Sequence, residues 1–406
     1  MSGLSRQRDL VRELARRIAQ LAASDEYEVR RRRWRDVNGL RKPDRAPVWL
    51  RPAGCWPELL PDDALQCEDP YLRSLERALR MDLVKDEIGD DHLVESWWNV
   101  SAAFDCDSQH LWGLPTQVLT GRTDLGGWRF EPPLKTPEDF EKVTLPTFTY
   151  NAEHTQEAAA RADEVLGDIL PIRITCGPHL GSILNCFVDQ LRGLNDMMLD
   201  LYVQPHLIHR LMAKFLEASL RDLRTVEESG LLTTNNYGGM HCSDPINGDP
   251  PPGQVKLHHL WCDANSQEFD EVSPRQWEEF LLHYQMPIFQ QFGLVHYGCC
   301  EDLTTKIQGV LSIPNLRLFV CSAWTNLEKV IEACGQKYCI MWRQSAAEVT
   351  LSDSLDKVEK HLDDGLRKLQ GHYYQIVLRE LQTLGGHPRR LHEYTKLAIA
   401  KAEQWA

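Results

Sequence analysis

The sequence predicts a (β/α)8 barrel, the TIM-barrel fold, with extra helices before its first strand. Eight short apolar segments alternate with longer segments of helical periodicity, and this alternation is typical of a parallel sheet. Eight strands joined by crossovers fit a closed barrel better than an open sheet, and 406 residues suit such a barrel with insertions. We therefore expect one barrel domain at 46–406 and a helical extension packed on it at 1–45.

The eight expected strands are short apolar runs, most of them bounded by polar, glycine or proline residues. They are 46–51, 93–98, 171–175, 230–235, 257–261, 293–299, 315–322 and 337–342. The expected helices carry apolar residues at intervals of three or four. They are 5–23, 27–39, 195–224, 274–291, 325–334 and 353–381.

Two long segments are expected to be loops that carry function. They are 100–169 and 236–256, both rich in residues that favour turns. Each follows the carboxyl end of an expected strand, where barrel enzymes build their sites. Tryptophans in or near the first loop, Trp97 among them, could wall a substrate pocket. The alternative is that they pack against the barrel rim.

Composition excludes several classes of protein. A formal charge of −14 argues against general affinity for nucleic acid, and no run of 18 apolar residues predicts a membrane span. Twelve cysteines, none in CxxC spacing and with no secretory signal, indicate reduced thiols and a cytoplasmic protein. The run Arg30–Arg33 is expected to be the solvated face of a helix. Its alternative is a basic patch that steers an acidic partner.

The sixth expected strand ends in residues that suit a metal. Because successive strand side chains point to opposite faces, His296 and Cys300 should share one face and Cys299 should point to the other. A catalytic zinc takes about three protein ligands and keeps one position open. The nearest candidate carboxylate is Glu268, so the predicted ligands are Glu268, His296 and Cys300. Other candidate ligands are His241, Cys242 and Cys262. Which cysteine binds stays open, and a plain core thiol is the alternative for either.

Four segments resemble, in order, motifs of the uroporphyrinogen decarboxylase-like superfamily. They are Pro47–Glu58 (PVWLRPAGCWPE), Arg192–Pro205, Val272–Pro287 and His296–Glu301. The last lies where the corrinoid-dependent methyltransferase branch carries its metal-binding histidine and cysteine. The resemblance extends over about 27–345 and implies a barrel with its site at the carboxyl ends of the strands.

One departure from the decarboxylases is informative. Their N-terminal signature carries two arginines that hold substrate carboxylates. Arg51 keeps the first place, but Cys55 and Trp56 replace the second arginine and the tyrosine after it. A tetrapyrrole with eight carboxylates needs several arginine partners, so this chain is not expected to decarboxylate uroporphyrinogen.

The resemblance therefore implies a zinc-dependent methyltransferase. It would move a methyl group from a small methylated substrate, such as a methyl ether, to cobalt(I) of a corrinoid (cobalamin) carried by a separate protein. The chain lacks the DxHxxG signature of a cobalamin domain. Alternatives are methyl transfer from methylcobalamin to a thiol, a decarboxylase of another tetrapyrrole or small acid, and a corrinoid-binding protein without activity. A homodimer is an open alternative for the assembly.

The same reasoning assigns roles to individual residues. The expected proton donors to the leaving oxygen are His241, Glu301 and Asp302, and the expected substrate contacts are Arg51, His179 and Trp97.

Overall fold

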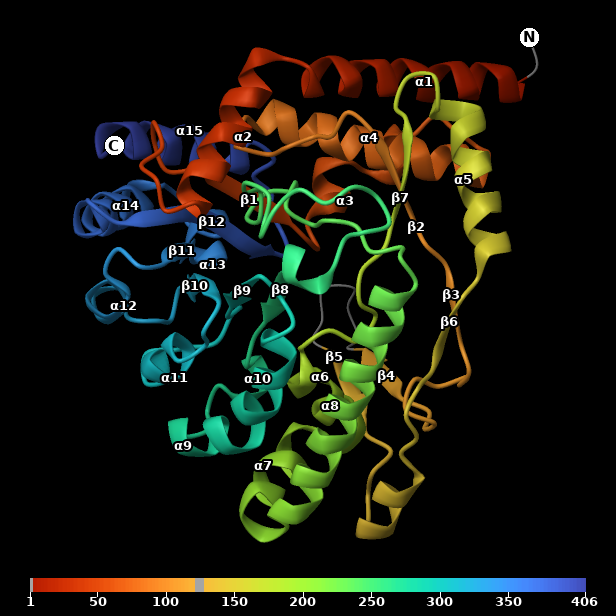
Figure 1. The fold of residues 1–406 in the computed structure, drawn as a ribbon. Coiled ribbons are helices and arrows are strands. Elements are labelled where there is room, and N and C mark those ends of the chain that lie inside the picture. Colours follow the sequence, from red (N-terminus) through yellow and green to blue (C-terminus); the bar gives the residue numbers. More distant parts are fainter. Residues whose placement is uncertain (1–2, 121–127) are drawn as a thin grey trace.

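Helices surround a curved parallel sheet in the computed structural model, which describes residues 3–120 and 128–406 (Figure 1). The helices are α1 Gly3–Ala22, α2 Asp25–Asn38, α3 Trp56–Leu59, α4 Pro70–Ile88, α5 Ala152–Leu166, α6 Leu184–Arg192, α7 Leu194–Val203, α8 Pro205–Glu228, α9 Pro274–Trp277, α10 His283–Phe289, α11 Ile307–Leu311, α12 Leu327–Cys334, α13 Ala346–Thr350, α14 Asp356–Leu369 and α15 Arg390–Gln404. No helix in the described part of the chain is long and apolar enough to cross a membrane.

The strands of the described residues form four separate sheets. They are β1 Val48–Pro52, β2 Trp98–Ser101, β3 Phe104–Cys106, β4 Gln117–Thr120, β5 Trp128–Glu131, β6 Phe148–Tyr150, β7 Ile172–Thr175, β8 Trp261–Ala264, β9 Leu294–Tyr297, β10 Leu316–Cys321, β11 Cys339–Gln344 and β12 Tyr373–Leu381. One parallel sheet has the order β1-β12-β11-β10-β9-β8, and β2 pairs in parallel with β7. The pairs β3–β6 and β4–β5 are antiparallel. In Figure 1 the six-stranded sheet curves through the left half and β2 and β7 lie to its right.

A mixed α/β fold is confirmed, but a closed eight-stranded barrel is not. The segment 230–235, expected as a strand, forms no strand, although it is hydrogen-bonded to residues of β8 and to the residue after β7. The Thr233 N–H donates to the Cys176 carbonyl at 3.1 Å, next to β7. On the other side, the Asn235 side-chain amide bonds both the N–H and the carbonyl of Trp261 at 2.9 Å. A side chain thus replaces the backbone ladder here and interrupts the sheet.

The expected helix 353–381 is wrong in its second half. Helix α14 ends at Leu369, and Tyr373–Leu381 forms β12, the strand between β1 and β11. Residues 374–378 of β12 are all buried, because apolar and polar side chains alike are enclosed on the two faces of this strand. A strand buried on both faces lacks the period of two that marks a half-exposed strand, so it resembles part of a helix.

Two other strands are displaced along the chain. Strand β2 begins at Trp98, where the expected strand 93–98 ends. Strand β8 begins at Trp261, because the residues Leu257–His259 form a 3-10 turn instead. The displacement matters for β8, since it brings Asp263 into the sheet.

Helices α1 and α4 pack against each other through apolar side chains of one buried cluster. In α1 these side chains include Val11, Leu14 and Ile18, which are buried. Helix α4 begins where the Asp69 side chain accepts a backbone N–H of the first turn. It ends at Gly89, whose φ of 80° is the left-handed conformation that favours glycine at a helix end.

Helix α2 packs against interior-facing residues of the six-stranded sheet. Trp34 and Val37 share one buried cluster with interior-facing strand residues, among them Leu318, Met341 and Val377. The Trp34 indole donates to the Asp91 carbonyl at 2.8 Å. The second expected N-terminal helix therefore contributes directly to the core of the sheet.

The arginine run in α2 is neither a solvated face nor a basic patch, so both interpretations of Arg30–Arg33 are wrong. Arg30 and Arg33 are buried, and only Arg32 of the four is exposed. Arg33 pairs with Asp44 at 2.6 Å and also bonds the buried carboxylate of Asp91. Helical spacing turns these side chains toward acidic partners from later segments, which a local charge count does not reveal.

Candidate functional site

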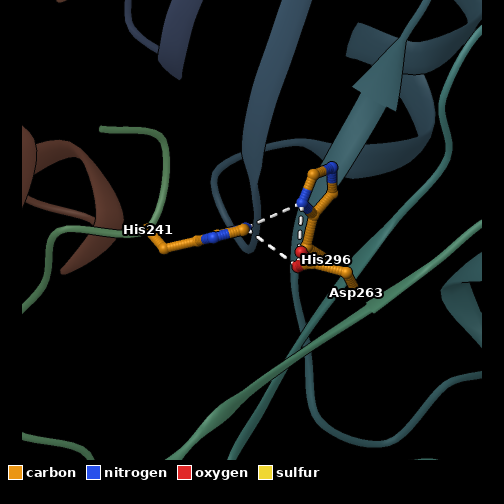
Figure 2. A group of neighbouring side chains, drawn as sticks. All are labelled: His241, Asp263 and His296. Atoms are coloured by element: carbon orange, nitrogen blue, oxygen red, sulfur yellow. Dashed lines mark hydrogen bonds and ion pairs between the residues drawn. The ribbon is translucent and has the colours of Figure 1, made fainter. Parts of the chain in front are cut away.

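Two imidazoles and a carboxylate meet in the interior of the curved sheet (Figure 2). His241 Nε2 lies 2.8 Å from His296 Nδ1 and 3.0 Å from Asp263 Oδ1, and His296 Nδ1 lies 3.3 Å from the same oxygen. We call these three residues the triad. The possible ligand atoms of the triad, one from each residue, all lie within 4.8 Å of one another, which suits the coordination of one metal ion.

The sheet register places two members of the triad. Asp263 in β8 is the direct neighbour of His296 in β9, so their side chains lie side by side on one face. His296 is buried, whereas 58% of the Asp263 side chain is accessible to solvent. Asp263 therefore borders an opening, although strands surround it.

His241 comes from the loop 236–256 and is held from both sides. The Asn38 amide donates to the carbonyls of Met240 and Cys242, at 2.9 and 2.8 Å. Gln375 in β12 donates to the Met240 carbonyl at 3.0 Å and to Asn38 Oδ1 at 2.8 Å. The loop is thereby fixed to α2 and β12, so the His241 imidazole meets the strands in a defined position.

The charges of the triad suit a cation. Desolvation disfavours the Asp263 carboxylate, but His241 and His296 outweigh it and hold the Asp263 pKa well below its usual range. Burial lowers the His296 pKa, against the opposing pull of Asp263. An ionised carboxylate and a neutral imidazole are the protonation states that bind metal. The His296 Nε2 atom is buried and has no hydrogen-bond partner among the described residues.

A second group of donors lies where β9 ends. Gly298 has a φ of 114°, and a Cβ there would lie 2.8 Å from Val320 Cβ, so only glycine fits. This turn ends the alternation of the strand, and the prediction that Cys299 and Cys300 point apart is wrong. Their sulfurs are 3.5 Å apart, both residues are partly exposed, and Glu380 of β12 lies beside them.

The two thiols differ in acidity. A hydrogen bond from Cys300 lowers the Cys299 pKa, and the positive charges of Arg379 and Arg343 add to this against the effect of burial. The same hydrogen bond raises the Cys300 pKa. Arg343 also bonds the Cys299 carbonyl and pairs with Glu380. We call Cys299, Cys300 and Glu380 the thiol group.

The structure separates the three expected metal ligands. His296 lies in the triad and Cys300 in the thiol group, while Glu268 is in neither of the two groups formed by the described residues. The Glu268 carboxylate instead accepts a hydrogen bond from Asn185, and burial raises its pKa. Glu268, His296 and Cys300 as one ligand set stays a prediction that a metal analysis must test.

The expected acids occupy different positions. His241 is in the triad. Glu301 is buried and accepts hydrogen bonds from the Ser266 and Cys299 N–H groups at 2.7 and 2.9 Å, so it ties together the loops after β8 and β9. Asp302 accepts from the Thr304 N–H at 2.8 Å. Proton donation by any of the three is still a prediction.

The expected substrate contacts are spread over the molecule. Arg51 is exposed at the end of β1. His179 bonds Asp222 at 2.7 Å and stacks on Phe148, with ring centroids 4.4 Å apart.

Trp97 packs edge-on against Tyr237, with ring centroids 5.6 Å apart, and Arg173 lies over both rings. It lines a surface pocket together with Glu95, whose pKa burial raises to about 7. Substrate contact by Arg51, His179 or Trp97 stays a prediction.

Sequence reasoning did not single out Asp263, Arg343, Arg379 or Glu380. Each is a charged residue in a mostly apolar strand, in the runs WCDA, CIMWRQ and YYQIVLREL. A charge placed within a strand core is uncommon unless it has a partner or a role, and this was the signal available.

The fold and the site together define an α/β protein with imidazole, carboxylate and thiol donors on parallel strands and on the loops next to them. A solved methyltransferase from Methanosarcina mazei is similar in fold, with a TM-score of 0.54 and 14% sequence identity, over 93% of this chain and 98% of that one. At this identity the likeness shows the fold alone. No protein-family model and no curated protein sequence matches the chain.

Proposed function

We propose that this chain is a zinc-dependent methyltransferase of the uroporphyrinogen decarboxylase-like superfamily, with the barrel architecture of that superfamily. It would transfer a methyl group from a small methylated substrate, such as a methyl ether, to cobalt(I) of a corrinoid protein. The triad is the observation that carries the proposal, because it offers one metal three donors in a fold similar to that of a methyltransferase. The motifs from Pro47–Glu58 to His296–Glu301 support the choice of branch.

The triad suits zinc by the chemistry of its donors. Two imidazole nitrogens and one carboxylate oxygen are a common ligand set of catalytic zinc, which keeps one further position open. When bound there, zinc would act as a Lewis acid toward the oxygen that carries the methyl group. The accessible side of Asp263 would give a substrate a way to that position.

The protein's own residues would bind and orient the substrate. The C–O bond of the ether would break heterolytically, so that both of its electrons stay on the oxygen. The methyl group would pass to the corrinoid, the methyl acceptor, whose cobalt(I) would supply the electron pair of the new bond and become methyl-cobalt(III). The leaving oxygen keeps the electron pair and takes up a proton. No protein side chain is a sufficient nucleophile toward an unactivated methyl ether, so the corrinoid partner is required.

The reaction can be tested directly by spectroscopy. We expect that zinc-loaded protein, free cobalamin or a corrinoid protein reduced to cobalt(I), and a panel of methyl ethers give the spectrum of methyl-cobalt(III). The rate should rise with protein concentration and should fall to the no-enzyme background in the Asp263→Ala variant. Omitting the corrinoid should abolish demethylation, because the methyl group then has no acceptor.

Two results would contradict the proposal. One is conversion of a methyl ether by the chain alone. The other is a decarboxylated product, such as carbon dioxide released from a small acid, with no methylation of cobalt by any donor in the panel.

A further inference from the structure

Three arginines come together on three adjacent strands of the six-stranded sheet. Arg51 is at the end of β1, Arg379 in β12 and Arg343 in β11. Strand β12 lies between the other two, with Pro52 of β1 opposite Leu381. All three side chains therefore belong to the carboxyl-end region of neighbouring strands, where barrel-like enzymes bind substrates.

One of the three arginines has its partners within the protein. The Arg343 side chain is 2% exposed, pairs with Glu380 and bonds the Cys299 carbonyl. Glu380 has a φ of 59°, an unusual value for a residue other than glycine, which turns its carboxylate toward these arginines. The charge of Arg343 is thereby balanced.

Arg379 is not balanced in this way. Its side chain is only 16% exposed, and its ion pair among the described residues is a 3.8 Å approach of Nε to Glu380, which Arg343 already engages. The guanidinium donates no hydrogen bond to a described residue, although it carries five N–H groups. Arg51, nearby, has neither a hydrogen bond nor an ion pair there. Three guanidinium groups thus share the single carboxylate of Glu380, so a further anion would be stabilised beside Arg379.

The surroundings of Arg379 connect it to the candidate active site. Burial lowers its pKa, and repulsion from Arg343 and Arg51 adds to the effect. Its charge also favours the Cys299 thiolate and disfavours protonation of His296. Because Arg379 directly precedes Glu380 in β12, an anion bound by Arg379 would lie near the thiol group.

We propose that Arg379, assisted by Arg51, binds an oxyanion of the methylated substrate, so that the enzyme acts on small methylated acids. That the substrate is methylated rests on the proposed function. The oxyanion site itself does not depend on that function. The planar guanidinium can hold a carboxylate or a phosphate through two parallel hydrogen bonds, and carboxylate and phosphate probes distinguish the two chemistries.

The experiment compares an acid with its neutral analogue. Calorimetry at constant ionic strength measures binding of 4-methoxybenzoate, 4-methoxybenzamide, acetate and inorganic phosphate to the full chain. We expect saturable binding of at least one oxyanion, and the benzoate should bind about tenfold or more tightly than the benzamide. The Arg379→Gln variant should lose about tenfold in affinity for the oxyanion, while any binding of the benzamide stays unchanged.

Two variants control for structural effects. Arg367→Gln removes an exposed arginine of α14 that pairs with Asp364, and oxyanion binding should not change. Arg51→Gln removes an exposed side chain that has no hydrogen bond or ion pair to a described residue, so the variant should fold normally and still bind the oxyanion more weakly. Circular dichroism verifies the fold of each variant.

The outcomes separate this inference from the proposed function. If none of the oxyanions binds, or if Arg379→Gln and Arg51→Gln both bind them as the unaltered chain does, the oxyanion site is refuted. Oxyanion binding that depends on Arg379, without methyl transfer to any corrinoid, would support this site and remove the methyltransferase proposal. Methyl transfer from neutral methyl ethers that does not depend on Arg379 would support the methyltransferase proposal and remove the oxyanion site.

Discussion

Replacing Asp263 with alanine is expected to reduce bound zinc about tenfold or more relative to the unaltered chain. Asp263 supplies the only negative charge of the triad, and both imidazoles lie within 3.3 Å of its Oδ1. Removing it leaves two neutral nitrogens for a divalent cation and takes away one of about three protein ligands. Elemental analysis of protein purified in zinc, then dialysed, measures the loss.

The matched variants decide between the two donor groups. His296→Gln should lose zinc as Asp263→Ala does, since it removes a triad nitrogen. Cys300→Ser should keep zinc, because its sulfur belongs to the thiol group. His258→Gln, an exposed histidine of the same chain segment, serves as the control for a general effect of losing an imidazole.

Other results would assign the metal differently. Full zinc in Asp263→Ala together with loss in Cys300→Ser would move the site to Cys299, Cys300 and Glu380. Loss in Cys300→Ser, His296→Gln and Glu268→Gln alike would restore the ligand set that the sequence predicts. Protein that binds no zinc in any form would refute the zinc-dependent mechanism.

The Asp91→Ala variant is expected to lower the free energy of unfolding by about 3–5 kcal/mol, the range for breaking a buried ion pair by removing one partner. The Asp91 side chain is 1% exposed and is bonded by Arg33, by Arg45 at 2.6 Å and by the Val48 N–H at 2.7 Å. Without it, two largely enclosed guanidinium groups each lose their buried carboxylate partner, and a backbone donor loses its acceptor. The shift of the urea-unfolding midpoint measures the effect.

An exposed ion pair provides the comparison. Asp364→Ala removes the partner of Arg367, and both side chains are more than half exposed, so the change should be below about 1 kcal/mol. Equal midpoints for Asp91→Ala and Asp364→Ala would show that the Asp91 network contributes little. Helix α2 would then be held chiefly by the apolar contacts of Trp34 and Val37.

Local sequence patterns determined much of the fold. The helical periodicity of 5–23 and 27–39 predicts α1 and α2 to within about two residues at each end, because a half-buried helix repeats its apolar face every turn. The strands β1, β7, β9, β10 and β11 overlap their predicted segments as well. Each is a short apolar run between polar or turn residues, and such runs carry their own signal.

The candidate site was only partly visible in the sequence. His241 and His296 were singled out as single residues in a loop and a strand, but nothing local showed that they meet. Their approach depends on Asn38 and Gln375, which lie roughly 200 residues before and 130 residues after the loop they hold. Asp263 was missed because β8 begins four residues later than its predicted segment, which left this carboxylate outside the expected strand.

The sequence by itself thus determined the class of fold, the N-terminal helices and a set of metal-type side chains near the carboxyl ends of strands. The tertiary structure alone decided which of those side chains share a site. Strand register set Asp263 beside His296, and the positive φ of Gly298 brought Cys299 and Cys300 together. Inserting β12 between β1 and β11 added Arg379 and Glu380. Contacts between residues far apart in the chain are fixed by packing of the whole molecule, and no local pattern encodes them.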